Sequence, residues 1–217
     1  MFFNKIGVFT LAAVCSTAGL AQITLNQQPT RQIGQTQLPQ PNPFNVTTVN
    51  PNLVEGREFF SPTGIAVDTS VTPPRVYVAD TRNNRVLAWK DAVNFTNGKP
   101  ADLVLGQRDM ISTFANGPNR NTTNPLSTGF AVPSGVAVYQ GDLYVADAGN
   151  DRVLRFRKPF SATDQVPDLC IGQPSFNTTT VNYPGGQFNS PTDKGLALNN
   201  GSSAFTVAIT SRFSASA

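Results

Sequence analysis

Two stretches of this sequence repeat each other, and they decide the fold. The first, residues 62–89, reads PTGIAVD and, after a spacer, VYVADTRNNRVLAW. The second, residues 133–156, reads PSGVAVYQGDLYVADAGNDRVLRF. Both contain Pro-x-Gly-(Ile/Val)-Ala-Val followed by Tyr-Val-Ala-Asp-x-x-Asn-x-Arg-Val-Leu-x-aromatic. Two long matches in the same order indicate a duplicated structural unit.

A shorter phrase extends the repeat to both sides of these stretches. An apolar residue followed by Gly-Gln occurs at Gly34, Gly106 and Gly172, and these glycines are 72 and 66 residues apart. The two copies of the Pro-x-Gly phrase are 71 residues apart. A fixed period near 70 residues is typical of a repeat architecture.

Each unit contains four short apolar runs separated by turn residues. The runs are residues 64–67, 76–79, 85–89 and 101–106 in the first unit, and 135–138, 143–146, 152–156 and 168–172 in the second. Their close spacing favours an antiparallel meander. Four short strands with a glycine and an aromatic residue at fixed offsets are typical of a propeller blade. We therefore predict an all-β fold, a partial β-propeller of four-stranded antiparallel blades.

The blocks SPTGIAVD (61–68), VADTRNNRV (78–86) and VADAGNDRV (145–153) resemble the NHL-repeat family of β-propellers. The resemblance covers two repeats and the edges of two more. It implies a closed ring of about six four-stranded blades, within the usual range for propellers. This chain has about two full blades plus fragments. Two blades leave two apolar faces bare, which predicts low stability or self-association in isolation.

The predicted organisation follows from these repeats and from composition. Its parts are a signal peptide (1–21), an Asn/Gln/Pro-rich lead-in with the final-strand phrase of a preceding blade (22–60), a first blade (61–109), an insert loop (110–131), a second blade (132–173), an insert loop (174–189) and an incomplete third blade (190–217). We align Gly195-Leu-Ala-Leu198 with the first strand of a third repeat. The pattern then stops in a divergent Ser/Ala-rich tail, which indicates a truncated or frame-shifted end.

The N-terminus predicts export. Lys5 precedes a short apolar run, and small residues allow cleavage after Ala21. We expect a secreted, extracellular or periplasmic protein, with no membrane span because no apolar stretch is long enough. Loss of Lys5 reduces the formal charge from +3 to +2, and no basic cluster stands out. A nucleic-acid partner is therefore not expected.

The residue inventory excludes several chemistries. The sequence has no histidine, which removes His-containing zinc sites, Ser-His-Asp triads and Cys-His dyads. After signal cleavage Cys170 is the one remaining cysteine, so no intramolecular disulfide can form. We predict that Cys170 is a buried small hydrophobe, and that the repeated aromatics Tyr77, Tyr144, Trp89 and Phe156 pack between blades.

One polar group recurs in both units. Its members are Asp80, Asn83 and Arg85, and Asp147, Asn150 and Arg152. We interpret it as a structural turn motif in which Asp begins an Asx-type turn, Asn takes the left-handed position and Arg fixes the turn. A binding or catalytic cluster is the alternative, but a catalytic set is usually not present once per blade. A calcium site at Asp147, Asn150 and Asp151 is disfavoured by the spacing and by the adjoining arginine.

The predicted function is that of an exported NHL-type binding scaffold, with no catalytic residues, cofactor or metal. A protein or carbohydrate ligand would contact the inserts at residues 110–129 and 173–189, because long loops often carry function. Two alternatives remain open. The resemblance also implies a remnant of a lyase- or lactonase-type propeller enzyme that holds a metal at its central channel. A purely structural module of a longer extracellular protein is the other.

Overall fold

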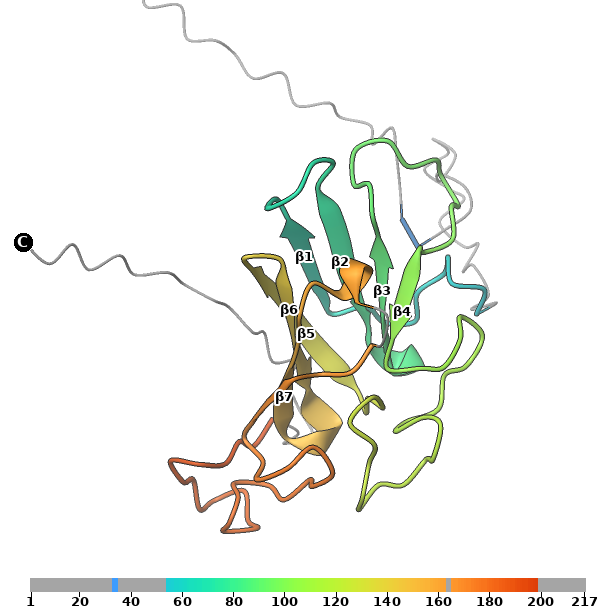
Figure 1. The fold of residues 1–217 in the computed structure, drawn as a ribbon. Helices are drawn as coiled ribbons and strands as arrows, with labels where there is room; N and C mark the ends of the chain where they lie inside the picture. Colours follow the sequence, from blue (N-terminus) through green and yellow to red (C-terminus); the bar gives the residue numbers. More distant parts are fainter. Residues whose placement is uncertain (1–32, 35–53, 163–164, 199–217) are drawn as a thin grey trace, which may run out of the picture.

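The computed structural model describes residues 33–34, 54–162 and 165–198, and within them it shows two four-stranded antiparallel sheets (Figure 1). The first sheet contains β1 (Gly64–Asp68), β2 (Arg75–Asp80), β3 (Arg85–Trp89) and β4 (Leu103–Leu105). The second contains β5 (Pro133–Tyr139), β6 (Asp142–Asp147), β7 (Arg152–Phe156) and β8 (Leu169–Ile171). Three short 3-10 turns complete the described elements: η1 (Thr81–Asn83), η2 (Ala148–Asn150) and η3 (Pro159–Ser161). The predicted all-β partial propeller is confirmed.

Short turns keep neighbouring strands paired in sequence order. Between β5 and β6, Gln140 and Gly141 both have positive φ, 51° and 84°, and they join the paired residues Tyr139 and Asp142. Two consecutive positive φ values are what a type I′ hairpin turn requires. The corresponding β1–β2 connection is longer, and Asp68 stabilises it by accepting hydrogen bonds from the backbone N and the Oγ of Ser70.

The two blades pack face to face, and the core lies between them. The main apolar cluster takes Tyr77, Ala79, Val86, Ala88 and Leu105 from the first blade, and Val136, Leu143, Val145, Leu154 and Phe156 from the second, together with Phe130. These residues alternate along their strands, as expected for sheets that present one face to a neighbour.

Burial raises the pKa of Tyr77 to about 12.

The repeated aromatic residues occupy equivalent places with different burial. Trp89 meets Phe59 edge to face at 5.8 Å between ring centroids, and Phe156 meets Phe130 at the same distance and in the same geometry. Trp89 and Phe156 are buried, as is Tyr77, but Tyr144 is half-buried. Cys170 is also half-buried, with burial raising the pKa of its thiol. Its position next to the core cluster is therefore more open than the sequence predicted.

A glycine follows the fourth strand of each blade, and its Cα lies against the side chain of the residue that leads into the next blade. Gly106 has φ +88°, and a Cβ there would lie 2.1 Å from the ring of Phe130. The two other close approaches of this type are Gly34 to Phe59 and Gly172 to Leu196. Leu196 is thus the structural equivalent of Phe59 and Phe130.

This equivalence changes the expected start of the third repeat. A Cβ on Gly195 would meet the backbone of residues 182–183, as one on Gly129 would meet the backbone of residues 116–117. Gly195 is therefore the equivalent of Gly129, not of Gly135 in β5, and the alignment expected for Gly195-Leu-Ala-Leu198 is shifted. The tail from residue 199 and the signal segment lie outside the described residues.

The free edge of the second blade carries a well-oriented ion pair. Arg155 on β7 donates from Nε and Nη2 to the two carboxylate oxygens of Asp168, each at 2.8 Å. This two-pronged bond to the ionised form lowers the pKa of Asp168 below its ordinary 3.8. Because both side chains are partly exposed, the pair contributes less than about 1 kcal/mol.

We expect the pH dependence of this pair to have a defined sign. The folded pKa of Asp168 is below the unfolded value, so its contribution to stability is present above about pH 4 and is lost as pH falls through the folded pKa. Arg155→Ala should raise the Asp168 pKa toward 3.8 in an NMR carboxyl titration. Asp91, whose pKa is lowered by the amides of Asn94 and Val93, should not move. An unchanged Asp168 titration would contradict the assigned cause.

Candidate functional site

The predicted polar group forms a buried network at the end of the first blade. Asp80 ends β2, and its Oδ2 accepts hydrogen bonds from Arg85 Nε at 2.7 Å and Asn83 Nδ2 at 2.8 Å. Its Oδ1 accepts a bond at 2.7 Å from the backbone N of Phe60, twenty residues earlier. The Asp80 and Arg85 side chains are both 0% exposed.

The second blade repeats this network with nearly the same geometry. Asp147 Oδ2 accepts from Arg152 Nε at 2.8 Å and Asn150 Nδ2 at 2.7 Å, and its Oδ1 accepts from the backbone N of Ala131 at 2.7 Å. Burial raises the pKa of Asp147, and the charge of Arg152 and the Asn150 amide oppose that rise. The structure therefore brings all six predicted residues into two matching networks.

The conformation of the turn differs from the one expected. The residues in the left-handed region are Asn84 and Asp151, with φ 51° and 48°, not Asn83 and Asn150. The aspartate side chains do not cap the 3-10 turns η1 and η2, so the turn is not of the Asx type. Each aspartate instead reaches back to the segment that enters its blade.

The arginines extend these networks into the insert loops. Arg85 Nη1 donates to the carbonyl of Met110, and Arg152 Nη1 donates to the equivalent carbonyl of Phe176. Arg152 Nη2 also donates to the carbonyl of Gly129 at 2.8 Å. Arg85 Nη2 donates to the carbonyl of Glu58 at 3.2 Å, so each guanidinium holds the segment before its blade and the loop after it. Because these charged groups are buried and bonded to the chain itself, they do not face a ligand.

The two insert loops share a set of backbone contacts, the shared frame, that was not predicted from the sequence. Gln107 Nε2 donates to the carbonyls of Asn84 and Phe114, and Gln173 Nε2 donates to those of Asp151 and Thr180. Nine residues after each glutamine, Asn116 and Asn182 have positive φ and donate from the backbone N to the carbonyl that leads into the next blade. A cis-proline peptide follows at residues 117–118 and 183–184. The Gly-Gln phrase and an Asn-x-Pro at a constant offset were the available signal.

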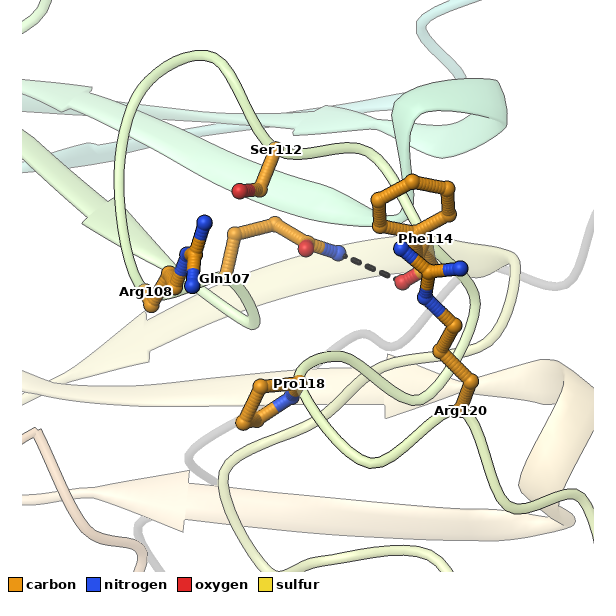
Figure 2. A pocket seen from close by; sticks show the side chains of 6 residues that line it. All are labelled: Gln107, Arg108, Ser112, Phe114, Pro118 and Arg120. Carbon is orange, nitrogen blue, oxygen red and sulfur yellow. Dashed lines mark hydrogen bonds between the residues drawn. The ribbon is translucent and has the colours of Figure 1, made fainter.

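The first insert adds residues that the second does not have. Arg108, Phe114 and Arg120 correspond in the shared frame to Pro174, Thr180 and Gly186. Arg120 places its guanidinium over the Phe114 ring, 3.3 Å from the centroid, and Phe114 is 47% exposed (Figure 2). A cation over an aromatic face is an attractive contact. It fixes the exposed Arg120 on the first insert loop.

These residues surround a small cavity of about 80 Å³. Its lining is Gln107, Arg108, Ser112, Phe114, Pro118 and Arg120 (Figure 2). A second hollow of about 440 Å³ shares Gln107, Arg108 and Pro118 with it and continues along β4 to Gln165 and Val166. The small cavity has room for one functional group, and the hollow has room for the rest of an extended ligand.

We call the small cavity and the adjoining hollow together the insert groove. Its polar groups can bind a ligand. Its charged donors are the guanidinium groups of Arg108 and Arg120. The Ser112 side chain is hydrogen-bonded to Asp109, and Gln165 Nε2 donates to the carbonyls of Pro159 and Ala162. Guanidinium groups suit carboxylate oxygens by geometry and charge. Asp109 pairs with Arg108 at 3.0 Å, which leaves the loop a small positive excess. Among the residues that the structure describes, no three His, Cys, Asp or Glu lie close enough to hold a metal ion.

A comparison with protein families identifies the type of repeat. Residues 130–156 match the family model for the NHL repeat, and the matched segment contains β5, β6 and β7. The predicted NHL resemblance is confirmed, and the first blade repeats the same phrases in the same four-stranded sheet. NHL repeats commonly mediate protein interactions. A comparison with curated proteins found no match. No described helix is long and apolar enough to cross a membrane.

Proposed function

We propose that this protein is an exported NHL-type propeller scaffold that binds a ligand through its insert loops and carries out no catalysis. One observation carries the proposal. The two inserts share one anchored frame, while the first adds an exposed arginine on an aromatic ring beside a hollow. Features that recur in every unit serve the fold. A feature present in one unit and exposed on a loop is where binding specificity is expected.

The ligand class follows from the insert groove. The small cavity has Arg108 and Arg120 at its wall and suits one carboxylate. Because Arg108 already pairs with Asp109, Arg120 supplies the charge that a ligand carboxylate would meet. The longer hollow offers apolar surface from Val104 and Val166. We propose a carbohydrate that bears carboxylates, such as a uronate oligosaccharide. An acidic protein segment offers the same carboxylate on a different backbone, and the experiment below separates the two.

Export and self-association belong to the same proposal. Export rests on the N-terminal sequence, in which Lys5, an apolar run and the small residues up to Ala21 have the order of a signal peptide. Self-association rests on apolar side chains that are exposed on the outer faces of both blades, Ile65 on the first and Ile171 on the second.

The proposal is tested by binding measurements on the purified chain. Neutral, uronate and sulfated oligosaccharides and an acidic peptide would be titrated by calorimetry at low salt. We expect saturable binding of the uronate oligosaccharide, weakened about tenfold by Arg120→Ala, because one charge-assisted contact contributes roughly 1.4 kcal/mol. Phe114→Ala should weaken binding as well, because it removes the support of that guanidinium.

Arg157→Ala is the matched control. Arg157 is an exposed arginine outside the inserts, and its nearest carboxylate oxygens lie at 3.6 and 4.0 Å. Its loss changes the net charge by the same amount and should leave binding as in the parent. Binding of the acidic peptide with an Arg120 dependence would move the assignment to a protein partner. Equal effects of the two arginine variants, or no saturable binding to any probe, would contradict the proposal.

A further inference from the structure

Each blade has two different faces, which we call forward and backward. One face of each blade is buried in the contact between the two blades. The forward face of the first blade consists of Ala66, Tyr77, Ala79, Val86 and Leu105, and its repeat equivalents on the second are Ala137, Tyr144, Ala146, Val153 and Ile171. The backward face of the second blade consists of Val136, Val138, Val145, Leu154 and Phe156, and its equivalents on the first are Ile65, Val67, Val78, Leu87 and Trp89. Between the blades, the forward face of the first packs on the backward face of the second.

The exposed fractions of repeat-equivalent side chains differ between the covered faces and the outer faces. Val136 on the covered backward face is 4% exposed, and its equivalent Ile65 on the outer one is 67% exposed. Leu105 on the covered forward face is 1% exposed, and its equivalent Ile171 is 46% exposed. Each outer face therefore has an exposed apolar part, with Ile65 and Val67 on the first blade and Ile171 on the second. The rest of the backward face of the first blade, Val78, Leu87 and Trp89, is buried in a cluster of its own.

The outer backward face is also hollowed. Ile33, Phe59, Gly64, Ile65, Val78 and Phe95 line most of an apolar recess of about 600 Å³. The repeat equivalents of Ile33, Phe59, Ile65 and Val78 are Leu105, Phe130, Val136 and Val145, and all four are buried in the core between the blades. In the internal interface the first blade occupies this space. The recess thus has the shape that a forward face fills.

We propose that a second copy of this chain docks head to tail, with the forward face of its second blade on the backward face of the first blade. The inference rests on the self-association proposed above and specifies its surfaces. Such contacts are heterologous, so they propagate until rotation closes a ring. Propellers close with about four to eight blades, which corresponds to about two to four copies that each contribute the two described blades. The forward face of the second blade differs from that of the first at one position: Arg155 stands where the first blade has the buried Ala88. Docking of a second copy would therefore cover Arg155 together with its partner Asp168, as a neutralised pair.

Charge substitutions on the two faces test the arrangement. Ile65→Arg and Ile171→Arg each place a charge in one proposed contact, and Ile111→Arg is the matched control. Ile111 is 72% exposed, lies in the first insert and does not line the recess. Mass by light scattering at matched concentration should give a discrete oligomer for the parent and for Ile111→Arg. Each face variant should lose that oligomer and be monomeric, with an unchanged β-type circular dichroism spectrum.

Mixing identifies the head-to-tail mode. Ile65→Arg retains an intact forward face, and Ile171→Arg retains an intact backward face. An equal mixture should therefore form a one-to-one pair that does not grow, while each variant alone stays monomeric. A symmetric face-to-face dimer would not be restored by mixing in this way.

Three outcomes would overturn the proposal. They are a monomeric parent, an oligomer that survives both face substitutions, and a mixture that remains monomeric. A monomeric parent that associates after removal of residues 199–217 would show that the tail covers a face instead of a second copy. Ligand titration of the monomeric variants is read separately, because neither isoleucine lines the insert groove. The association proposal can therefore fail while the ligand proposal holds, or the reverse.

Discussion

Arg152→Ala is expected to lower the free energy of unfolding by about 3–5 kcal/mol. The guanidinium is fully buried, and its loss leaves the Asp147 carboxylate in an apolar environment without its charge partner. It also removes the donors to the carbonyls of Phe176 and Gly129, which hold the insert loops on either side of the second blade. Buried polar groups without partners are costly, so the effect exceeds the value of the ion pair itself.

Arg155→Ala is the matched comparison for this measurement. Arg155 lies on the same strand and makes a two-pronged bond to Asp168, but it is partly exposed. Its loss should cost less than about 1 kcal/mol. Both variants would be compared with the parent by urea unfolding, followed by circular dichroism at concentrations where the chain is monomeric. Similar losses for the two arginines would contradict the role assigned to the buried network.

Gly106→Ala is expected to lower the free energy of unfolding by about 2–5 kcal/mol. About 1–2 kcal/mol arises from placing a Cβ on a left-handed backbone. A further 1–3 kcal/mol arises because that Cβ would lie 2.1 Å from the Phe130 ring, which must move within a packed core. Gly186→Ala isolates the first contribution: Gly186 has φ +72°, and the nearest atom to an added Cβ is Thr180 Cγ2 at 3.9 Å.

A double mutant separates strain from collision at Gly106. In a Phe130→Ala background, Gly106→Ala should cost about as much as Gly186→Ala, because the ring that it would strike is absent. The coupling between the two sites is then favourable, as expected for residues in direct contact. Equal costs of Gly106→Ala with and without the ring would show that the close fit to Phe130 is not what selects glycine.

The blades were predictable from sequence because their signals are local. Residues 85–89 and 152–156 are strands in the structure at the predicted bounds, and the remaining strands differ from prediction by a few residues at their ends. Apolar runs separated by turn residues determine these elements over short distances. The partners of Asp80 and Asp147 could not be predicted in this way. The bonds to the backbone of Phe60 and Ala131 join segments that are brought together only when a blade folds.

The insert groove was predictable only as a location. The sequence indicated that residues 110–129 and 173–189 are long polar loops, and they contain no strand in the structure. It did not indicate that Gln107 and Gln173 anchor them, although both glutamines occupy the same place in the repeat. Nor did it indicate that Arg120 lies on Phe114, because a contact between two unrepeated residues of an irregular loop has neither periodicity nor a second copy to reveal it.

The placement of the glycines under the next blade has a consequence for how such a gene can change length. The contacts of Gly34 with Phe59, Gly106 with Phe130 and Gly172 with Leu196 each join the end of one blade to the entry of the next. The contact between a glycine and the entry residue of the next blade therefore recurs once per unit. A recombination that joins two units at equivalent codons preserves this contact. Blades can be gained or lost by such unequal exchange without a new interface having to evolve, whereas an exchange out of phase would separate a glycine from its partner side chain.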